Sequence, residues 1–151
     1  MPCCIHYRGG YKYQLRRPYT LNVAVNPASE IAIGTFIILT PDGTLTIGQG
    51  YAWDGPSGPT VDTKNFMRGS LVHDALYQLM RNGLLDEEQW RKPADQELER
   101  ICREDGMFWL RRRWVYAAVR WFAKQSASTE SKKSDVTAPN NCEECDGATS
   151  G

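Results

Sequence analysis

The order of hydrophobic and polar residues divides the chain into a first part typical of strands and a second part typical of helices. Between residues 11 and 53, apolar side chains alternate with polar ones over short runs, as they do in half-buried strands. Residues 31–40 are rich in β-branched and aromatic side chains, and the Pro41-Asp42-Gly43 sequence after them is typical of a turn. Leu45 and Ile47 are then expected on the return strand of a hairpin.

Helical spacing replaces this alternation from Asn65 onward. Apolar residues recur every three or four positions, and Asn82-Gly83 predicts the end of this first helix. Pro93 suits the first turn of a second helix, which Asp105-Gly106 ends. A third helix is predicted over residues 107–124. Its expected inward stripe consists of Leu110, Trp114, Ala117, Ala118 and Trp121.

Strands followed by helices predict an α+β fold. N-terminal antiparallel strands and hairpins are expected to precede three helices, the first two forming an antiparallel pair, within a single domain over residues 1–125. Residues 126–151 contain almost no side chain suited to a core and are rich in Ser, Thr, Asn and Gly, which predicts a disordered tail. Removal of this tail is expected to leave the thermal stability nearly unchanged.

Cysteine usage predicts a fold without disulfides. The five cysteines stand at positions 3, 4, 102, 142 and 145, and an odd number with four near the termini is not typical of a disulfide framework. Cys102 has the spacing of a core residue. Cys142 and Cys145 have the CxxC spacing of a zinc ligand pair, which Cys3 and Cys4 would complete if the termini met. A lone CxxC in a Ser/Thr-rich segment is more often without a metal.

Charge and hydropathy argue against several classes of protein. Among 151 residues, 18 Lys and Arg balance 18 Asp and Glu, so no overall basic field favours nucleic acid, and no nucleic acid partner is expected. The longest aliphatic and aromatic run, residues 36–39, is far shorter than the ~20 residues of a transmembrane span. The N-terminal residues lack the apolar segment of a secretory signal, so the chain is expected to remain in a reducing cytosol.

The predicted third helix mixes aromatic residues with arginines. This composition would suit an anionic membrane surface or a nucleic acid. Packing of its apolar stripe on the core, with the arginines reaching solvent, is the favoured interpretation.

Residues with catalytic chemistry gather on the first two predicted helices. His73 and Tyr77 are four positions apart and share a helix face, whereas Asp74 points about a quarter-turn away. Asp95 shares a stripe with apolar residues, so its carboxylate is expected to face inward, where it needs a partner. In an antiparallel helix pair, Asp95 can accept a hydrogen bond from one imidazole nitrogen of His73 and leave the other able to take a proton from water.

A Gly- and Pro-rich loop precedes these helices. Asp74 and the backbone carbonyls of residues 53–58 would supply the hard oxygen ligands that Ca²⁺ prefers, and Gly55 and Gly58 tolerate the backbone angles that inward carbonyls require. An HD-type metal phosphohydrolase is disfavoured, because it needs several further histidines and only His6 remains.

The loop, the HDxxY segment at 73–77 and the AD dipeptide at 94–95 together resemble the phospholipase A2 superfamily, especially its short, disulfide-poor bacterial, fungal and parvoviral members. The resemblance covers roughly residues 51–102 and implies hydrolysis of a phospholipid or another ester. The implied catalytic residues are His73 as general base, Asp95 as its orienting partner and Tyr77 in a hydrogen bond with Asp95.

The same resemblance implies a Ca²⁺ ion that polarises the ester carbonyl and stabilises the oxyanion. Its ligands would be the carboxylate of Asp74 and the loop carbonyls of Trp53, Gly55 and Ser57. This sequence departs from the secreted enzymes at the cysteines that flank their histidine, and it also spaces the loop glycines differently. The replacing residues are Gly69, Ser70, Leu71 and Ala75.

The chain up to about residue 124 also resembles a family of small phage and prophage proteins that carry GYAWDGPSGP, an HDALY helix and a closing Trp- and Arg-rich helix. This resemblance implies an accessory protein in the cytoplasm of an infected bacterium or in the virion, with virion proteins as partners. The alternative to an enzyme is a non-enzymatic phage structural or assembly protein that keeps the loop and helix as architecture. A buried, capped His73 would favour that alternative.

Overall fold

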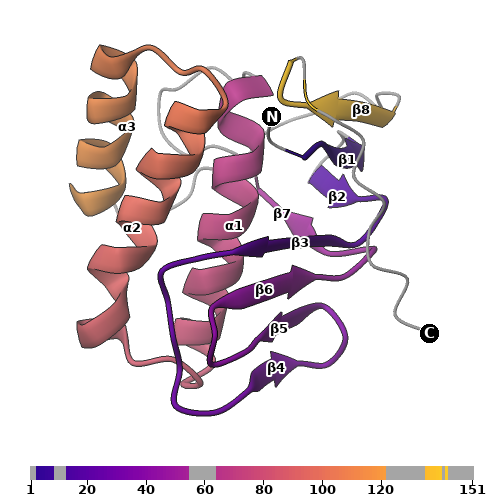
Figure 1. Cartoon of the computed structure of the whole chain (residues 1–151), viewed down its shortest axis with the longest axis vertical. Helices are drawn as coiled ribbons and strands as arrows, with labels where there is room; N and C mark the ends of the chain where they lie inside the picture. Colours follow the sequence, from indigo (N-terminus) through magenta and orange to yellow (C-terminus); the bar gives the residue numbers. More distant parts are fainter. Residues whose placement is uncertain (1–2, 9–12, 55–63, 122–134, 141, 143–151) are drawn as a thin grey trace.

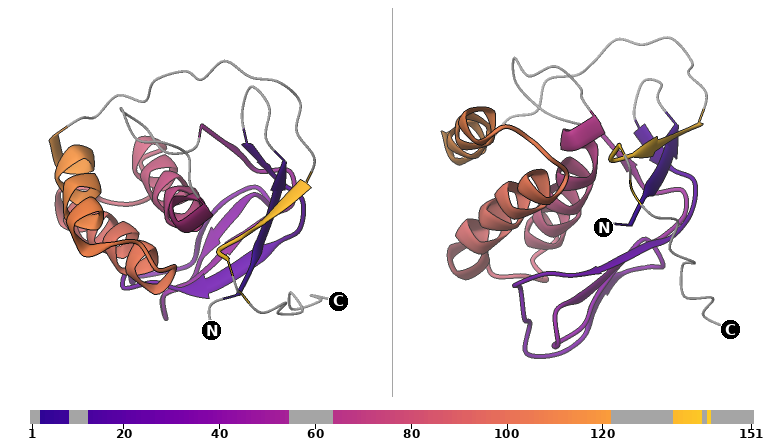
Figure 2. Two further views of the ribbon diagram at one scale, coloured as in Figure 1. Left: turned by 90° about the horizontal axis from the view of Figure 1, so that it is seen from above. Right: turned by 45° about the horizontal axis from the view of Figure 1, so that its top comes forward.

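The computed structural model describes residues 3–8, 13–54, 64–121, 135–140 and 142. Within these residues α1 lies between two sheets and α2, and α3 packs on the outer side of α2, as both Figure 1 and Figure 2 show. The predicted α+β fold is confirmed. The helices are α1 (Lys64–Arg81), α2 (Glu87–Glu104) and α3 (Trp109–Trp121).

The strands of the described residues form two four-stranded sheets with the orders β7-β2-β1-β8 and β3-β6-β5-β4. Each neighbouring pair of strands is antiparallel. Their bounds are β1 (Ile5–Arg8), β2 (Tyr13–Leu15), β3 (Tyr19–Asn22), β4 (Ile31–Ile33), β5 (Ile37–Leu39), β6 (Thr44–Ile47), β7 (Ala52–Trp53) and β8 (Asp135–Ala138).

The predicted hairpin is the pair formed by β5 and β6, in which Leu39 lies opposite Leu45. Gly43 in its turn has a φ of +87°, and a Cβ atom there would lie 2.4 Å from the carbonyl oxygen of Val23. Only glycine therefore fits this turn without a backbone shift. Leu45 and Ile47 are fully buried, so the alternation read from the sequence corresponds to the inward face of β6.

The first helix ends where the sequence predicts. Gly83 has a φ of +72°, and its N–H donates to the carbonyl of Met80 at 2.9 Å. The N–H of Leu84 donates to the carbonyl of Leu79 at 3.0 Å, which completes a Schellman-type end. The turn after α1 then leads directly into α2.

The start of the second helix differs from the prediction. The helix begins at Glu87, and Pro93 lies inside it rather than in its first turn. Asp86 is the N-cap, because its Oδ1 accepts hydrogen bonds from the backbone N–H of Glu88 at 2.8 Å and of Gln89 at 3.3 Å. This N-cap and the acidic residues of the first turn determine where the helix starts. The prediction was wrong because it used Pro93 as the marker of the first turn.

Gly69 marks the close approach of α1 and α2. A Cβ atom at Gly69 would lie 2.8 Å from Leu98 Cδ1 and 3.0 Å from Cys102 Sγ, and both of these side chains are buried. The helix backbones can approach this closely because position 69 has no side chain. Cys102 is a buried free thiol, which confirms its predicted place in the core.

One residue of the predicted inward stripe of α3 is wrong; the side chains of the other four, Leu110, Trp114, Ala118 and Trp121, lie outside those that the structure describes. Val115 is buried with only 2% exposure, and Ala117, which was placed on the inward stripe, is exposed. Several faces of this helix carry apolar residues, so spacing alone could not identify the packed one. The contact with α2 selects the side that contains Val115.

The C-terminal segment contributes a strand where a disordered tail was predicted. Asp135–Ala138 forms β8, which pairs with β1 in a register that places Ala138 opposite Ile5. Ala138 is fully buried, so this short apolar contact and the strand hydrogen bonds order the segment. The rest of residues 126–151, apart from 139, 140 and 142, lies outside the described residues.

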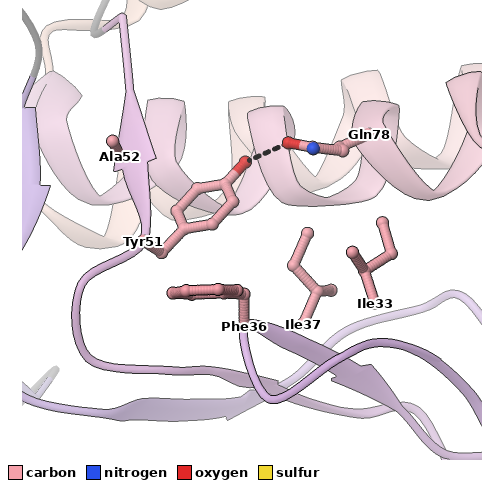
Figure 3. A pocket seen from close by; sticks show the side chains of 6 residues that line it. All are labelled: Ile33, Phe36, Ile37, Tyr51, Ala52 and Gln78. Atoms are coloured by element: carbon pink, nitrogen blue, oxygen red, sulfur yellow. Dashed lines mark hydrogen bonds between the residues drawn. The ribbon is translucent and has the colours of Figure 1, made fainter.

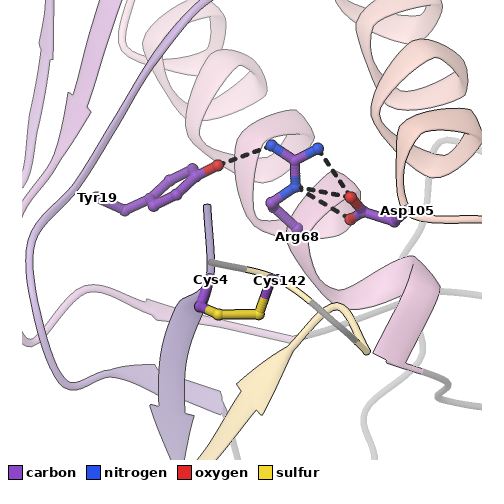
Figure 4. Close-up of a disulfide and its surroundings, with 5 residues drawn as sticks. All are labelled: Cys4, Tyr19, Arg68, Asp105 and Cys142. Carbon is purple, nitrogen blue, oxygen red and sulfur yellow. Dashed lines mark hydrogen bonds and ion pairs between the residues drawn. A yellow bond between two sulfur atoms is a disulfide. The ribbon is translucent and has the colours of Figure 1, made fainter. Parts of the chain in front are cut away.

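The β1–β8 pairing also overturns the prediction of a fold without disulfides. Cys4 and Cys142 are joined in a disulfide across 138 positions of sequence (Figure 4). Cys3 is disulfide-bonded as well. The odd cysteine count misled the prediction because Cys102 stays a buried thiol, while the two ends of the chain meet only in the folded sheet.

Arg68 connects the start of α1 to the end of α2 and to β3 (Figure 4). Its guanidinium donates two hydrogen bonds to Asp105 Oδ1, at 3.1 and 2.8 Å, and one to Tyr19 Oη at 2.8 Å. Burial raises the pKa of Asp105, and the hydrogen bonds and charge of Arg68 oppose that rise. This buried pair holds the helix pair in place near its end.

No helix of the described residues combines the length and the hydropathy that a membrane-spanning segment requires.

Candidate functional site

His73 and Asp95 meet at the interface of α1 and α2. His73 Nε2 lies 2.7 Å from Asp95 Oδ1. The Asp95 side chain is fully buried, whereas that of His73 retains 12% exposure. The structure thus brings together the two residues that the helical spacing placed on facing stripes, and part of the His73 side chain remains exposed.

Tyr77 completes this cluster from the same face of α1. Its hydroxyl donates to Asp95 Oδ1 at 2.6 Å, and its ring centroid lies 4.1 Å from that of His73. Burial raises the pKa of Tyr77, and the hydrogen bond to Asp95 raises it further, so the phenol remains protonated at neutral pH. The imidazole is therefore held at one edge by a carboxylate and on one face by a phenol ring.

The second imidazole nitrogen has a different environment. Two donors converge on Asp95 Oδ1, which is the behaviour of an ionised carboxylate, so Nε2 of His73 carries a hydrogen and, in the neutral imidazole, Nδ1 holds the lone pair. None of the described residues forms a hydrogen bond with Nδ1. An oriented imidazole with an unshared lone pair is the arrangement of a general base.

Arg91 is a member of the cluster that was missed in the sequence. The electrostatic interaction with Tyr77 and the negative charge of Asp95 raise the pKa of Arg91, so its guanidinium lies near both groups. A cation at this position offsets part of the cost of burying the Asp95 carboxylate. The signal was present, because Arg91 stands four positions before Asp95 and so shares its helix face.

Asp74 lies on a different side of α1, as its position next to His73 predicts. It is buried, with 7% exposure. Burial raises the pKa of Tyr51, and the charges of Asp74 and Asp54 raise it further, so both carboxylates lie near that phenol. Asp54 was not among the predicted site residues, although it is the last described residue before the Gly-rich loop.

The predicted calcium ligands are only partly within the described residues. The indole of Trp53 is buried and donates from Nε1 to Ser70 Oγ at 3.0 Å, so this side chain anchors β7 to α1. Gly55 and Ser57 lie outside the described residues. Asp74 and Asp54 are hard oxygen donors near the start of that loop, and this donor chemistry fits Ca²⁺.

A pocket of about 210 Å³ opens on the Asp74 side of α1. Tyr51 and Gln78 form its polar end, where the Tyr51 hydroxyl donates to Gln78 Oε1 at 3.2 Å (Figure 3). The other lining residues are apolar: Ile33, Phe36, Ile37 and Ala52.

Comparison of the chain with protein-family models, with curated proteins and with solved structures found no match.

Proposed function

We propose that this protein hydrolyses carboxylic esters, with phospholipids as the substrate class, by means of a phospholipase A2-like His/Asp pair. The supporting observation is the paired hydrogen bonding of Asp95 Oδ1 by His73 and Tyr77, combined with the absence of a hydrogen bond from the described residues to His73 Nδ1.

The proposed reaction uses His73 as a general base. Nδ1 takes a proton from a water molecule, and the water oxygen adds to the ester carbonyl carbon. Asp95 stabilises the imidazolium that forms, and Tyr77 keeps the carboxylate in place. The imidazolium then returns the proton to the leaving alkoxide as the ester bond breaks, so that one ester and one water become one acid and one alcohol.

Calcium is part of this proposal. When bound, Ca²⁺ supplies a positive charge that polarises the ester carbonyl and stabilises the oxyanion. Asp74 is the proposed carboxylate ligand, and Asp54 is a second acidic group on the same side of α1. The loop carbonyls of Trp53, Gly55 and Ser57 remain the proposed backbone ligands.

The biological setting is proposed from the sequence resemblance. The GYAWDGPSGP loop and the HDALY helix are similar to those of phage and prophage proteins. We therefore propose a phage accessory protein that acts in the infected bacterial cytoplasm or in the virion alongside virion proteins, and the Cys4–Cys142 disulfide favours the virion, because disulfides are rare in a reducing cytoplasm.

The decisive experiment is hydrolysis of a fluorogenic phospholipid during a Ca²⁺ titration. We expect turnover by the wild type and a loss of about 10²–10⁴-fold in His73→Ala, because general-base catalysis is removed. His6→Ala is the matched control, since it removes the other histidine of the chain, on β1. Equal turnover by His73→Ala and wild type would reject the assignment, and no turnover of any ester would favour a non-enzymatic phage protein.

A further inference from the structure

Two aromatic side chains stand exposed where α2 leads into α3. Phe108 is 65% exposed and Trp109 is 53% exposed, and their ring centroids lie 5.8 Å apart. Met107, immediately before them, is buried and fixes the turn to the core. The two rings thus form a small apolar patch on a rigid support, and adjacent exposed aromatic residues of this kind mark contact surfaces.

Two arginines that are near this turn in the sequence are exposed. Arg113 is exposed and follows Trp109 by one helical turn, so the two share a face of α3. Arg103, near the end of α2, is exposed as well. The acidic residues of the turn are already paired, because Asp105 is hydrogen-bonded to the buried Arg68, and Glu104 is bonded to Arg68 and Arg100.

We propose that the turn between α2 and α3, with Phe108, Trp109, Arg103 and Arg113, docks on an anionic lipid bilayer. Aromatic side chains are favoured at the headgroup level of a bilayer, and arginines bind lipid phosphates. The charge of the two arginines is complementary to an anionic surface. Figure 2 shows α3 on the outer side of α2, away from both sheets, and the exposure of Phe108 and Trp109 leaves both rings open to a membrane surface.

This docking does not depend on the proposed ester hydrolysis, although a bilayer is also where a phospholipid substrate lies. The test therefore measures binding without chemistry, by co-sedimentation with vesicles of ether-linked lipids that cannot be hydrolysed. Vesicles of phosphatidylcholine containing phosphatidylglycerol are compared with phosphatidylcholine alone. His73→Ala is expected to bind as the wild type does, so that a failure of catalysis and a failure of docking are distinguished.

The variants separate the apolar from the ionic contribution. We expect Phe108→Ser/Trp109→Ser to weaken binding to the anionic vesicles by roughly tenfold or more, since two apolar side chains no longer insert. Arg113→Gln should weaken it about fivefold and reduce its salt dependence. The matched control is Phe36→Ser/Lys92→Gln, which removes an exposed ring and an exposed cation elsewhere and should change little.

Three outcomes overturn the proposal. The first is no binding of the wild type to the anionic vesicles, and the second is equal binding by wild type and both patch variants. The third is that the wild type does not bind vesicles but forms a dimer in sedimentation velocity, and that Phe108→Ser/Trp109→Ser dissociates this dimer. That result would assign the patch to contact with a second copy of the chain. Circular dichroism confirms that each variant is folded, and the exposure of both rings makes this the expected result.

Discussion

Asp95 Oδ1 accepts hydrogen bonds from two side chains, His73 and Tyr77, in a position closed to solvent. A buried carboxylate is costly unless donors satisfy it, and the loss of one such donor typically costs about 1–3 kcal/mol. Asp95 therefore has both a structural role, as the partner of two α1 side chains, and a proposed chemical role, as the group that orients the imidazole. Any test of the site has to separate the two.

The substitution Asp95→Asn makes that separation. The amide keeps the size of the side chain but cannot stabilise an imidazolium, so ester turnover should fall by roughly 10²–10⁴-fold while the protein remains folded. The measurements are kcat on the fluorogenic phospholipid and a thermal melt. Glu88→Gln, an exposed carboxylate-to-amide change on the same helix, serves as the control. Undiminished kcat in folded Asp95→Asn would contradict the role of Asp95.

The Cys102 thiol is predicted to be unreactive in the folded protein. Burial, and secondarily the Asp105 charge, raise the pKa of Cys102 to about 12. The folded state therefore holds this proton more tightly than the unfolded state, and the stability it contributes is present below the unfolded pKa and lost as pH rises toward 12. At pH 8, alkylation with iodoacetamide should spare Cys102 until denaturant is added. Mass spectrometry showing its rapid modification in the native protein would contradict this environment.

The geometry of the candidate site depends on the distance between helices α1 and α2. Gly69 lies against Leu98 and Cys102, and Asp105 at the end of α2 is bonded to Arg68 of α1. These contacts are separate from the site, yet they set the spacing at which His73 and Asp95 are within hydrogen-bond distance. A change in the helix spacing should therefore alter the site without touching its residues.

Gly69→Val tests this dependence. The added side chain overlaps buried neighbours, and we expect a loss of about 1–3 kcal/mol in the free energy of unfolding, together with reduced turnover. Gln96→Val is the control, because it places the same β-branched residue at an exposed helical position, where only a few tenths of a kcal/mol are expected. Urea unfolding of both variants measures the difference. Equal stabilities would show that the interface can move apart at no cost.

At the scale of the whole molecule, the connection between the two ends of the chain contributes to the stability of the fold. β8 pairs with β1, and the disulfide between Cys4 and Cys142 closes almost the entire chain into one loop. Closing a long loop lowers the entropy of the unfolded chain, which stabilises the folded one. Residues 135–138 are therefore part of the folded domain, although the composition around them is that of a tail.

Truncation after Gln125 should consequently destabilise the protein, contrary to the sequence prediction. Loss of β8 and of the Cys4–Cys142 bridge is expected to lower the free energy of unfolding by about 2–5 kcal/mol, and reduction of the intact chain should reproduce part of that loss. Guanidinium unfolding of the oxidised, reduced and truncated proteins measures each step, and peptide mapping identifies the disulfide. Identical stabilities of all three would contradict the closure, and stoichiometric zinc in elemental analysis would reassign the thiols.

Local patterns were sufficient where a structural feature depends on neighbouring residues. The hairpin of β5 and β6 and the end of α1 at Gly83 follow from alternation and from turn residues, which act over a few positions. The inward orientation of Asp95 follows from its place in a helical stripe. The facing of His73 and Asp95 needed one further assumption, that the two helices form an antiparallel pair.

The sequence by itself determined the strand-rich first part, the existence of three helices and the inward face of the first two, because propensity and periodicity are local properties, but it did not reveal β8 or the start of α2. Only the tertiary structure decided that β8 joins β1, that Cys4 meets Cys142, and that Val115 rather than Ala117 faces the core. The first two contacts join residues that are far apart in the chain, and the third determines which of several apolar faces of α3 packs against α2. The free energy that stabilises these contacts comes from packing between distant segments, which a short stretch of sequence cannot encode. The approach of Arg91 on α2 to Tyr77 on α1 is a contact of the same kind.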